Sequence, residues 1–155
     1  MEVLFYVAIA IFLRYIIFIW TQYGVLSSIS ESYYRLPQEL KILFTIFCWG
    51  FAIPVMIMGS SVLTFLAGSA ICFVGAAAAF KEKLTSTVHE IGAYVGVILA
   101  QVALVVDMQL WWLSAIFFVT SLFLTIWKNK VKHPIWWIEL TAFTTTLIGL
   151  GIKVL

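Results

Sequence analysis

Six long apolar runs constrain the fold more than any other feature of this chain. A helix needs about 20 predominantly apolar residues, or about 17 at the short end, to cross the hydrocarbon core of a bilayer. The runs are continuous rather than alternating, and in lipid a helix pairs its own backbone groups, which favours helices over a barrel. The sequence therefore predicts an all-α, polytopic bundle of six transmembrane helices. The predicted spans are about 3–22, 40–58, 61–80, 88–106, 110–127 and 134–152.

The composition agrees with this prediction. Hydrophobic residues make up 64% of the chain and charged residues only 10%, whereas a soluble domain carries about 25% charged residues. We therefore expect residues 1–155 to form a single transmembrane domain. The net charge of +2, with no extended basic patch, argues against a nucleic acid partner. The expected partner is the lipid bilayer, and another membrane protein or a second copy of this chain are further candidates.

The distribution of basic residues predicts the orientation. Six spans place the connections 23–39, 81–87 and 128–133 on one side of the membrane. The opposite side carries only Lys153. Because basic residues accumulate in cytoplasmic connections, these three are predicted to be cytoplasmic, with both termini outside. The basic residues in or beside them are Arg35, Lys41, Lys81, Lys83, Lys128, Lys130 and Lys132.

The connection 23–39 carries the pattern of a short helix. Ser28 and Glu31 have the spacing of a capping box, in which the serine accepts an early backbone N–H and the glutamate reaches back. A helix from Ile29 to Leu36 would place four residues on its polar face, namely Ser27, Ser30, Glu31 and Tyr34. We expect an interfacial helix along the headgroups, with a polar rim over a substrate or ion entrance as the alternative. The face toward lipid or core would carry Leu26, Ile29, Tyr33 and Leu36.

Both histidines are expected at the cytoplasmic interface. Thr87 and Glu90 have the spacing of a second capping box, which places His89 in the first turn of the fourth span. His133 precedes Pro134, a favoured first helical residue. The two histidines match neither HxxxH nor HExxH, so no metal site is predicted. The sequence names no cofactor. If the protein is an enzyme, the catalytic candidates are His89, His133, Glu31, Glu90 and Ser30.

Two charged residues lie inside predicted spans. Arg14 is roughly 12 Å, and Glu139 roughly 7.5 Å, from the cytoplasmic ends of their helices at 1.5 Å per residue. Charges at such depth are costly unless they are paired or snorkel to the interface. Because the depths are similar, we predict an intramembrane polar pair of Arg14 and Glu139, with snorkelling of Arg14 as the alternative.

A stripe of small residues marks a helix contact. Gly92, Gly96 and Ala100 recur at four-residue spacing in the fourth span, a pattern that lets helix backbones approach closely. A chain of six helices supplies internal partners, so the stripe predicts packing within the bundle in preference to a dimer contact.

The sequence leaves three functions open. The first is a binding or assembly module with a polar cluster on the cytoplasmic side. The second is a membrane-embedded enzyme that acts on a lipid or lipid-linked substrate at the cytoplasmic interface, with His89 or His133 as base or ligand. The third is an oligomeric channel or small transporter whose polar path includes Arg14, Glu139 and Gln101. The binding module is the first choice, because the capping boxes explain much of the polar cluster without catalysis.

Overall fold

The computed structural model describes residues 1–77 and 84–155, with side chains for 1–76 and 89–155. The described ranges contain helices and no strand, so the all-α prediction is confirmed. The helices are α1 (Glu2–Tyr23), α2 (Ser32–Arg35), the 3-10 helix η1 (Gln38–Leu40), α3 (Ile42–Gly59), α4 (Val62–Ala77), α5 (Leu84–Val106), α6 (Trp111–Ile126) and α7 (Pro134–Val154).

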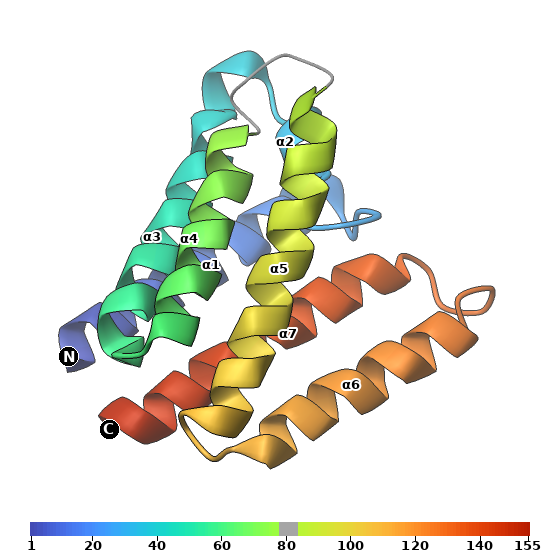
Figure 1. Ribbon diagram of the computed structural model, residues 1–155. Coiled ribbons are helices and arrows are strands. Elements are labelled where there is room, and N and C mark those ends of the chain that lie inside the picture. Colours follow the sequence, from blue (N-terminus) through green and yellow to red (C-terminus); the bar gives the residue numbers. More distant parts are fainter. Residues whose placement is uncertain (78–83) are drawn as a thin grey trace.

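The helices form two groups (Figure 1). Helices α3, α4 and α5 run side by side, and α1 packs behind them against α3. Helices α6 and α7 form a second pair, which diverges from α5 toward the α6–α7 turn. The two termini lie at the same end of the molecule. This divergence leaves one side of α5 without a closely packed neighbour along part of its length.

Among the described residues, four helical segments are long and apolar enough to cross a membrane. They are Glu2–Tyr23, Gln38–Gly59, His89–Val106 and Pro134–Val154, and two shorter apolar helices cover Val62–Ala76 and Trp111–Ile126. Large apolar side chains are exposed on every long helix. A helical bundle with these properties is compatible with a membrane protein.

The fourth predicted span begins earlier than expected. Helix α5 starts at Leu84 rather than near residue 88, which places Thr87 inside the helix. The second capping box is therefore wrong, because a cap must precede the first helical turn. Lys81, Lys83 and most of the predicted connection 81–87 lie outside the described residues or their described side chains.

Glycines on α5 bring it close to α4. A Cβ atom built on Gly96 would lie 2.8 Å from the Cδ1 of Ile71 and 3.3 Å from the carbonyl oxygen of Ala67. A Cβ atom on Gly92 would lie 3.3 Å from the carbonyl oxygen of Ala70. Such a separation leaves no room for larger side chains. The small-residue stripe therefore packs within the bundle, as predicted.

Aromatic side chains join α1, α3 and α7. Tyr15 stacks on Phe47 with ring centroids 4.4 Å apart, and Phe143 of α7 meets the edge of Phe51 at 4.7 Å. Phe12 of α1 lies against the same rings. These contacts hold α7 against the α1–α3 pair, although α7 begins 75 residues after the end of α3 (134 − 59).

Replacing Gly96 by leucine should destabilise the bundle. The new side chain would have to displace Ile71 or push α5 away from α4, and overpacking of this kind costs about 1–3 kcal/mol. The free energy of unfolding in detergent micelles measures the effect. The control is Val95→Leu at an exposed neighbouring position, and equal stability of the two variants would contradict close α4–α5 packing.

Candidate functional site

A carboxylate on α7 anchors the connection between α1 and α2. The backbone N–H of Ile29 donates a hydrogen bond to Oε2 of Glu139, and Oγ of Ser30 donates to Oε1 at 3.3 Å. A carboxyl oxygen that accepts a buried backbone N–H removes the cost of leaving that N–H unpaired. Residues 29 and 30 are therefore held against α7 rather than left in a free loop.

A pair of hydroxyl groups, from Tyr15 and Ser32, holds the backbone of Ile29 on the side that faces α1. The hydroxyl of Tyr15 on α1 lies 2.6 Å from Oγ of Ser32, which is completely buried. Ser32 donates both its Oγ–H and its backbone N–H to the carbonyl oxygen of Ile29. The backbone of Ile29 is thus tied to α7 through its N–H and to α1 through its carbonyl. Sequence reasoning missed this contact, although a tyrosine inside an apolar run signals a need for a hydrogen-bond partner.

The predicted first capping box forms with one change. Ser28 Oγ accepts the backbone N–H of Glu31 at 3.0 Å, as expected. The carboxylate of Glu31 reaches Ser27 rather than Ser28, accepting its backbone N–H at 2.7 Å and its hydroxyl. Arg35 pairs with the same carboxylate at 2.8 Å. The hydroxyl of Ser27 first, and then its N–H, hold the pKa of Glu31 below the ordinary value of 4.5.

The α2 helix is shorter than the predicted helix over 29–36, because it spans only the four residues Ser32–Arg35. The predicted inward face is largely correct. Leu26, Ile29 and Leu36 are buried, while Tyr33 is half-buried. The turn before α2 is held by the side chains of Ser28 and Glu31, so the inward positions keep a helix-like spacing although the helix itself is brief.

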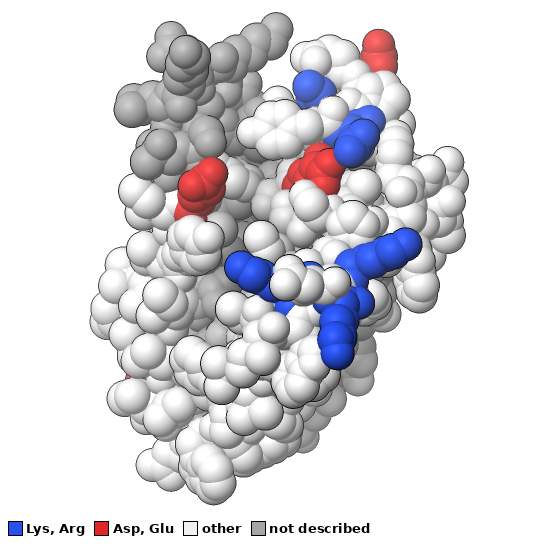
Figure 2. Space-filling model, turned by 90° about the vertical axis from the view of Figure 1, so that its right-hand side faces the viewer, with Lys and Arg blue, Asp and Glu red and all other residues white. Residues whose placement is uncertain are grey.

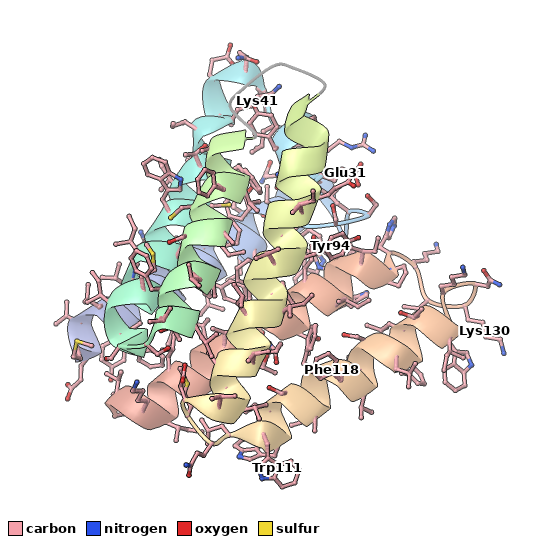
Figure 3. All side chains as sticks on the ribbon, in the orientation of Figure 1. Glu31, Lys41, Tyr94, Trp111, Phe118 and Lys130 are labelled. Carbon is pink, nitrogen blue, oxygen red and sulfur yellow. The ribbon has the colours of Figure 1, made fainter. Side chains whose placement is uncertain are left out.

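The divergence of α6 and α7 from α5 creates a groove of about 470 Å³, which we call the α5–α7 groove. Its walls are mainly apolar, with Tyr94 of α5 and Phe118 of α6 on facing helices (Figure 3). Its polar lining comes from the anchored connection, the start of α5, α6 and α7. These polar residues are Ser28, Ser30, His89, Glu90, Ser121 and Glu139.

His89 is half-buried in the lining of this groove. Its Nδ1 lies 3.3 Å from the carbonyl oxygen of Val74. A carbonyl only accepts, so this hydrogen bond places the proton on Nδ1 and leaves a lone pair on Nε2 of the neutral ring. Within the described part of the chain, Nε2 of His89 and Oγ of Ser121 are buried without a hydrogen-bond partner. Such atoms are costly unless something pairs with them.

The groove brings together some of the predicted site residues and leaves others out. Ser30, His89, Glu90 and Glu139 line it. His133 is exposed, adopts a left-handed conformation with φ 57° before Pro134, and does not line it. Glu31 is engaged with Ser27 and Arg35 outside it, as described above.

The predicted pair of Arg14 and Glu139 does not form. Arg14 is exposed and lines a separate groove between α1 and α3. The carboxylate of Glu139 instead accepts hydrogen bonds from residues 29 and 30. Within residues 1–76 and 89–155 the structure shows one ion pair, between Glu31 and Arg35. Similar depth did not bring the two charges together because they belong to different sides of the bundle.

Gln101 ties α5 to α6 and α7. Its side-chain Nε2 donates to Oγ1 of Thr145 at 3.1 Å, and its backbone carbonyl oxygen accepts from Oγ of Ser114 at 2.9 Å. All three residues are buried. These hydrogen bonds hold the α6–α7 pair to α5 on the side where the helices do not diverge.

No metal centre emerges from the described side chains. Within that part of the chain, no three His, Cys, Asp or Glu residues gather closely enough to hold a metal ion. Comparison with known proteins adds no assignment, since no protein-family model, curated protein or solved structure matches this chain.

Replacing Glu139 by alanine should loosen the connection. The substitution leaves the buried N–H of Ile29 without its acceptor, at a cost of about 1–3 kcal/mol, whereas Glu139→Gln retains an acceptor oxygen and should cost less. Hydrogen exchange of residues 24–32 and the unfolding free energy report the effect. The control on the same helix is Thr144→Ala, an exposed position whose hydroxyl bonds only its own helix. Equal protection in the alanine variants at 139 and 144 would refute the anchor.

The hydrogen bonds of Glu31 predict a dependence on acid. Since its pKa is lowered on folding, its contribution to stability is fully present above the ordinary value of 4.5 and is lost as the pH falls through the folded value. Glu31→Gln should therefore reduce the loss of thermal stability between pH 6 and pH 3. The comparison variant is Glu39→Gln on η1, where the side chain is exposed. An unchanged pH profile in Glu31→Gln would contradict the assignment.

Proposed function

We propose that this chain is a six-span membrane protein that acts as a binding module and takes an amphiphilic, lipid-like ligand in the α5–α7 groove. The observation that carries the proposal is the groove itself, about 470 Å³ with mainly apolar walls and a polar cluster. Ligand sites commonly have volumes of 300–1,000 Å³, apolar walls and a few polar groups that fix orientation. An amphiphile matches both parts of the lining.

Six crossings are supported by the arrangement of the helices. Four segments are long enough to cross, and α4 and α6, with 16 residues each, cover about 24 Å at 1.5 Å per residue. That length is short for a hydrocarbon core of about 30 Å and implies local thinning. An even number of crossings also agrees with termini at one end of the molecule (Figure 1).

The charges support an orientation with both termini outside. Basic side chains gather on one face of the molecule (Figure 2), and Lys128, Lys130 and Lys132 are exposed on the α6–α7 turn. At the other end Lys153 donates to the carbonyl oxygen of Gly59. The positive-inside rule then makes the turn and the segment 24–41 cytoplasmic. In this orientation α2 is interfacial and the polar lining of the groove is near the cytoplasmic surface.

An enzyme that acts on a lipid is the second candidate. The observation in its favour is that Ser30, His89 and Glu139 line one groove. Catalysis by a serine requires a base within hydrogen-bond reach to activate it. The carboxylate within reach of Ser30 is Glu139, at 3.3 Å, and it also holds the backbone of Ile29. This engagement in structural hydrogen bonds favours binding over catalysis.

The channel or transporter has less support. The polar path that the sequence predicts for a channel includes Arg14, Glu139 and Gln101. Arg14 lines a different groove from Glu139, and Gln101 is buried in hydrogen bonds between helices. These residues therefore do not form one continuous polar lining.

Labelling with a photoreactive amphiphile tests the binding module. A diazirine-bearing 18-carbon fatty alcohol, added to the protein in phosphatidylcholine nanodiscs, should crosslink to α5, α6 and α7 at groove positions and saturate. Ser121→Phe, which fills the groove, should reduce the labelling at least fivefold. The matched control is Ser69→Phe, which fills a different surface groove between α3 and α4. Diffuse labelling that neither saturates nor responds to Ser121→Phe would overturn the proposal.

A further inference from the structure

We infer that the ligand of the α5–α7 groove carries a hydrogen-bond-donating head group, an amine or a hydroxyl, rather than a phosphate or carboxylate. This inference rests on the proposed function and specifies its ligand. It follows from the hydrogen-bonding capacity that His89 and Glu139 retain, and from the charge of the groove lining.

The first argument is the tautomer of His89. Its Nδ1 donates to the carbonyl oxygen of Val74, so the free Nε2 of the neutral ring is an acceptor. Nε2 is buried, and no partner for it lies among the described residues. A ligand that pairs with this atom must therefore supply an N–H or O–H group. An ionised phosphate supplies acceptors only.

The second argument is the unused capacity of Glu139. A carboxylate has about four lone-pair positions. The N–H of Ile29 takes one at Oε2, and Ser30 donates both through its hydroxyl, at the longer distance of 3.3 Å to Oε1, and through its backbone N–H. Because Glu139 lines the groove, a donor on the ligand can reach an acceptor without removing the N–H of Ile29. An ammonium group gains most here, since hydrogen bonds between charged partners are the strongest.

The third argument is the charge of the lining. Glu139 lines the groove, and among the described lining residues there is no lysine or arginine. An anionic head group would lie beside this carboxyl group without a described cation to neutralise its charge. The lysines of the α6–α7 turn are exposed to solvent and are not part of this lining. The lining therefore selects against phosphate as well as for donors.

Three amphiphiles with the same chain separate the possibilities. Octadecylamine, octadecanol and octadecyl phosphate compete with the photoreactive fatty alcohol for wild-type protein in phosphatidylcholine nanodiscs. We expect the amine and the alcohol to halve the labelling at concentrations at least tenfold below that of the phosphate. Competition by the phosphate at the same or a lower concentration would overturn the inference while leaving groove binding intact. Absence of saturable labelling would instead overturn the proposed function.

His89→Asn isolates the acceptor atom. The asparagine amide keeps a donor near the position of Nδ1 and removes Nε2. We expect the concentrations of amine and alcohol that halve the labelling to rise about three- to tenfold, because one hydrogen bond is lost. The concentration of phosphate should change little. The matched control is His133→Asn, outside the groove. If the amine and the alcohol competed at the same concentrations in both variants, with intact folding shown by unchanged melting temperatures, a role for His89 would be contradicted.

Glu139→Gln gives a second test of the head-group preference, and this test does not depend on His89. The amide retains an acceptor oxygen for the backbone of residue 29 but loses the negative charge. The advantage of octadecylamine over octadecanol should then disappear, while the alcohol still competes. A preserved preference for the amine would show that Glu139 does not select the head group.

Discussion

The hydrogen bond from the backbone N–H of Ile29 to Glu139 is the interaction on which the rest of the arrangement depends. A buried backbone group outside a helix has no helical partner, so another part of the protein must supply one. Glu139 accepts the N–H of Ile29, and Ser32 donates to its carbonyl. These bonds fix the segment after α1 against α7. They also bring Ser28 and Ser30 into the lining of the α5–α7 groove.

Local pattern was sufficient to predict the helices and some of their contacts. Apolar runs of helix length gave the main helices, because burial in an apolar environment and backbone pairing act along each segment separately. The spacing of Gly92 and Gly96 predicted a close contact, and α4 fills it. The inward positions Leu26, Ile29 and Leu36 followed from helical spacing in the same way. Each of these predictions depends on residues within a few turns of one another.

Sequence patterns did not predict the contacts between segments that are distant in the chain. The predicted pair of Arg14 and Glu139 used depth along two helices, but depth does not tell which way a side chain points around its helix. The actual partner of Glu139 is a backbone N–H 110 residues away, and a backbone group leaves no signal in the sequence. The pair of Tyr15 and Ser32 was missed because spacing along the chain does not show which side chains of separate segments face each other. The α5–α7 groove depends on how far α6 and α7 diverge from α5, which no local spacing encodes.

Glu139 has two roles, anchoring the backbone of Ile29 and binding the ligand, and each role can use a different carboxylate oxygen. Oε2 holds the backbone of Ile29, and the hydroxyl of Ser30 makes a longer contact, 3.3 Å, with Oε1. A ligand donor that displaces this hydroxyl therefore replaces a weak hydrogen bond with a stronger one and leaves the anchor in place. A ligand that displaced the N–H of Ile29 from Oε2 would strand a buried N–H and lose much of what it gained. Ligand binding and a fixed connection are thus compatible at Oε1, on the side of the carboxylate that the hydroxyl of Ser30 occupies.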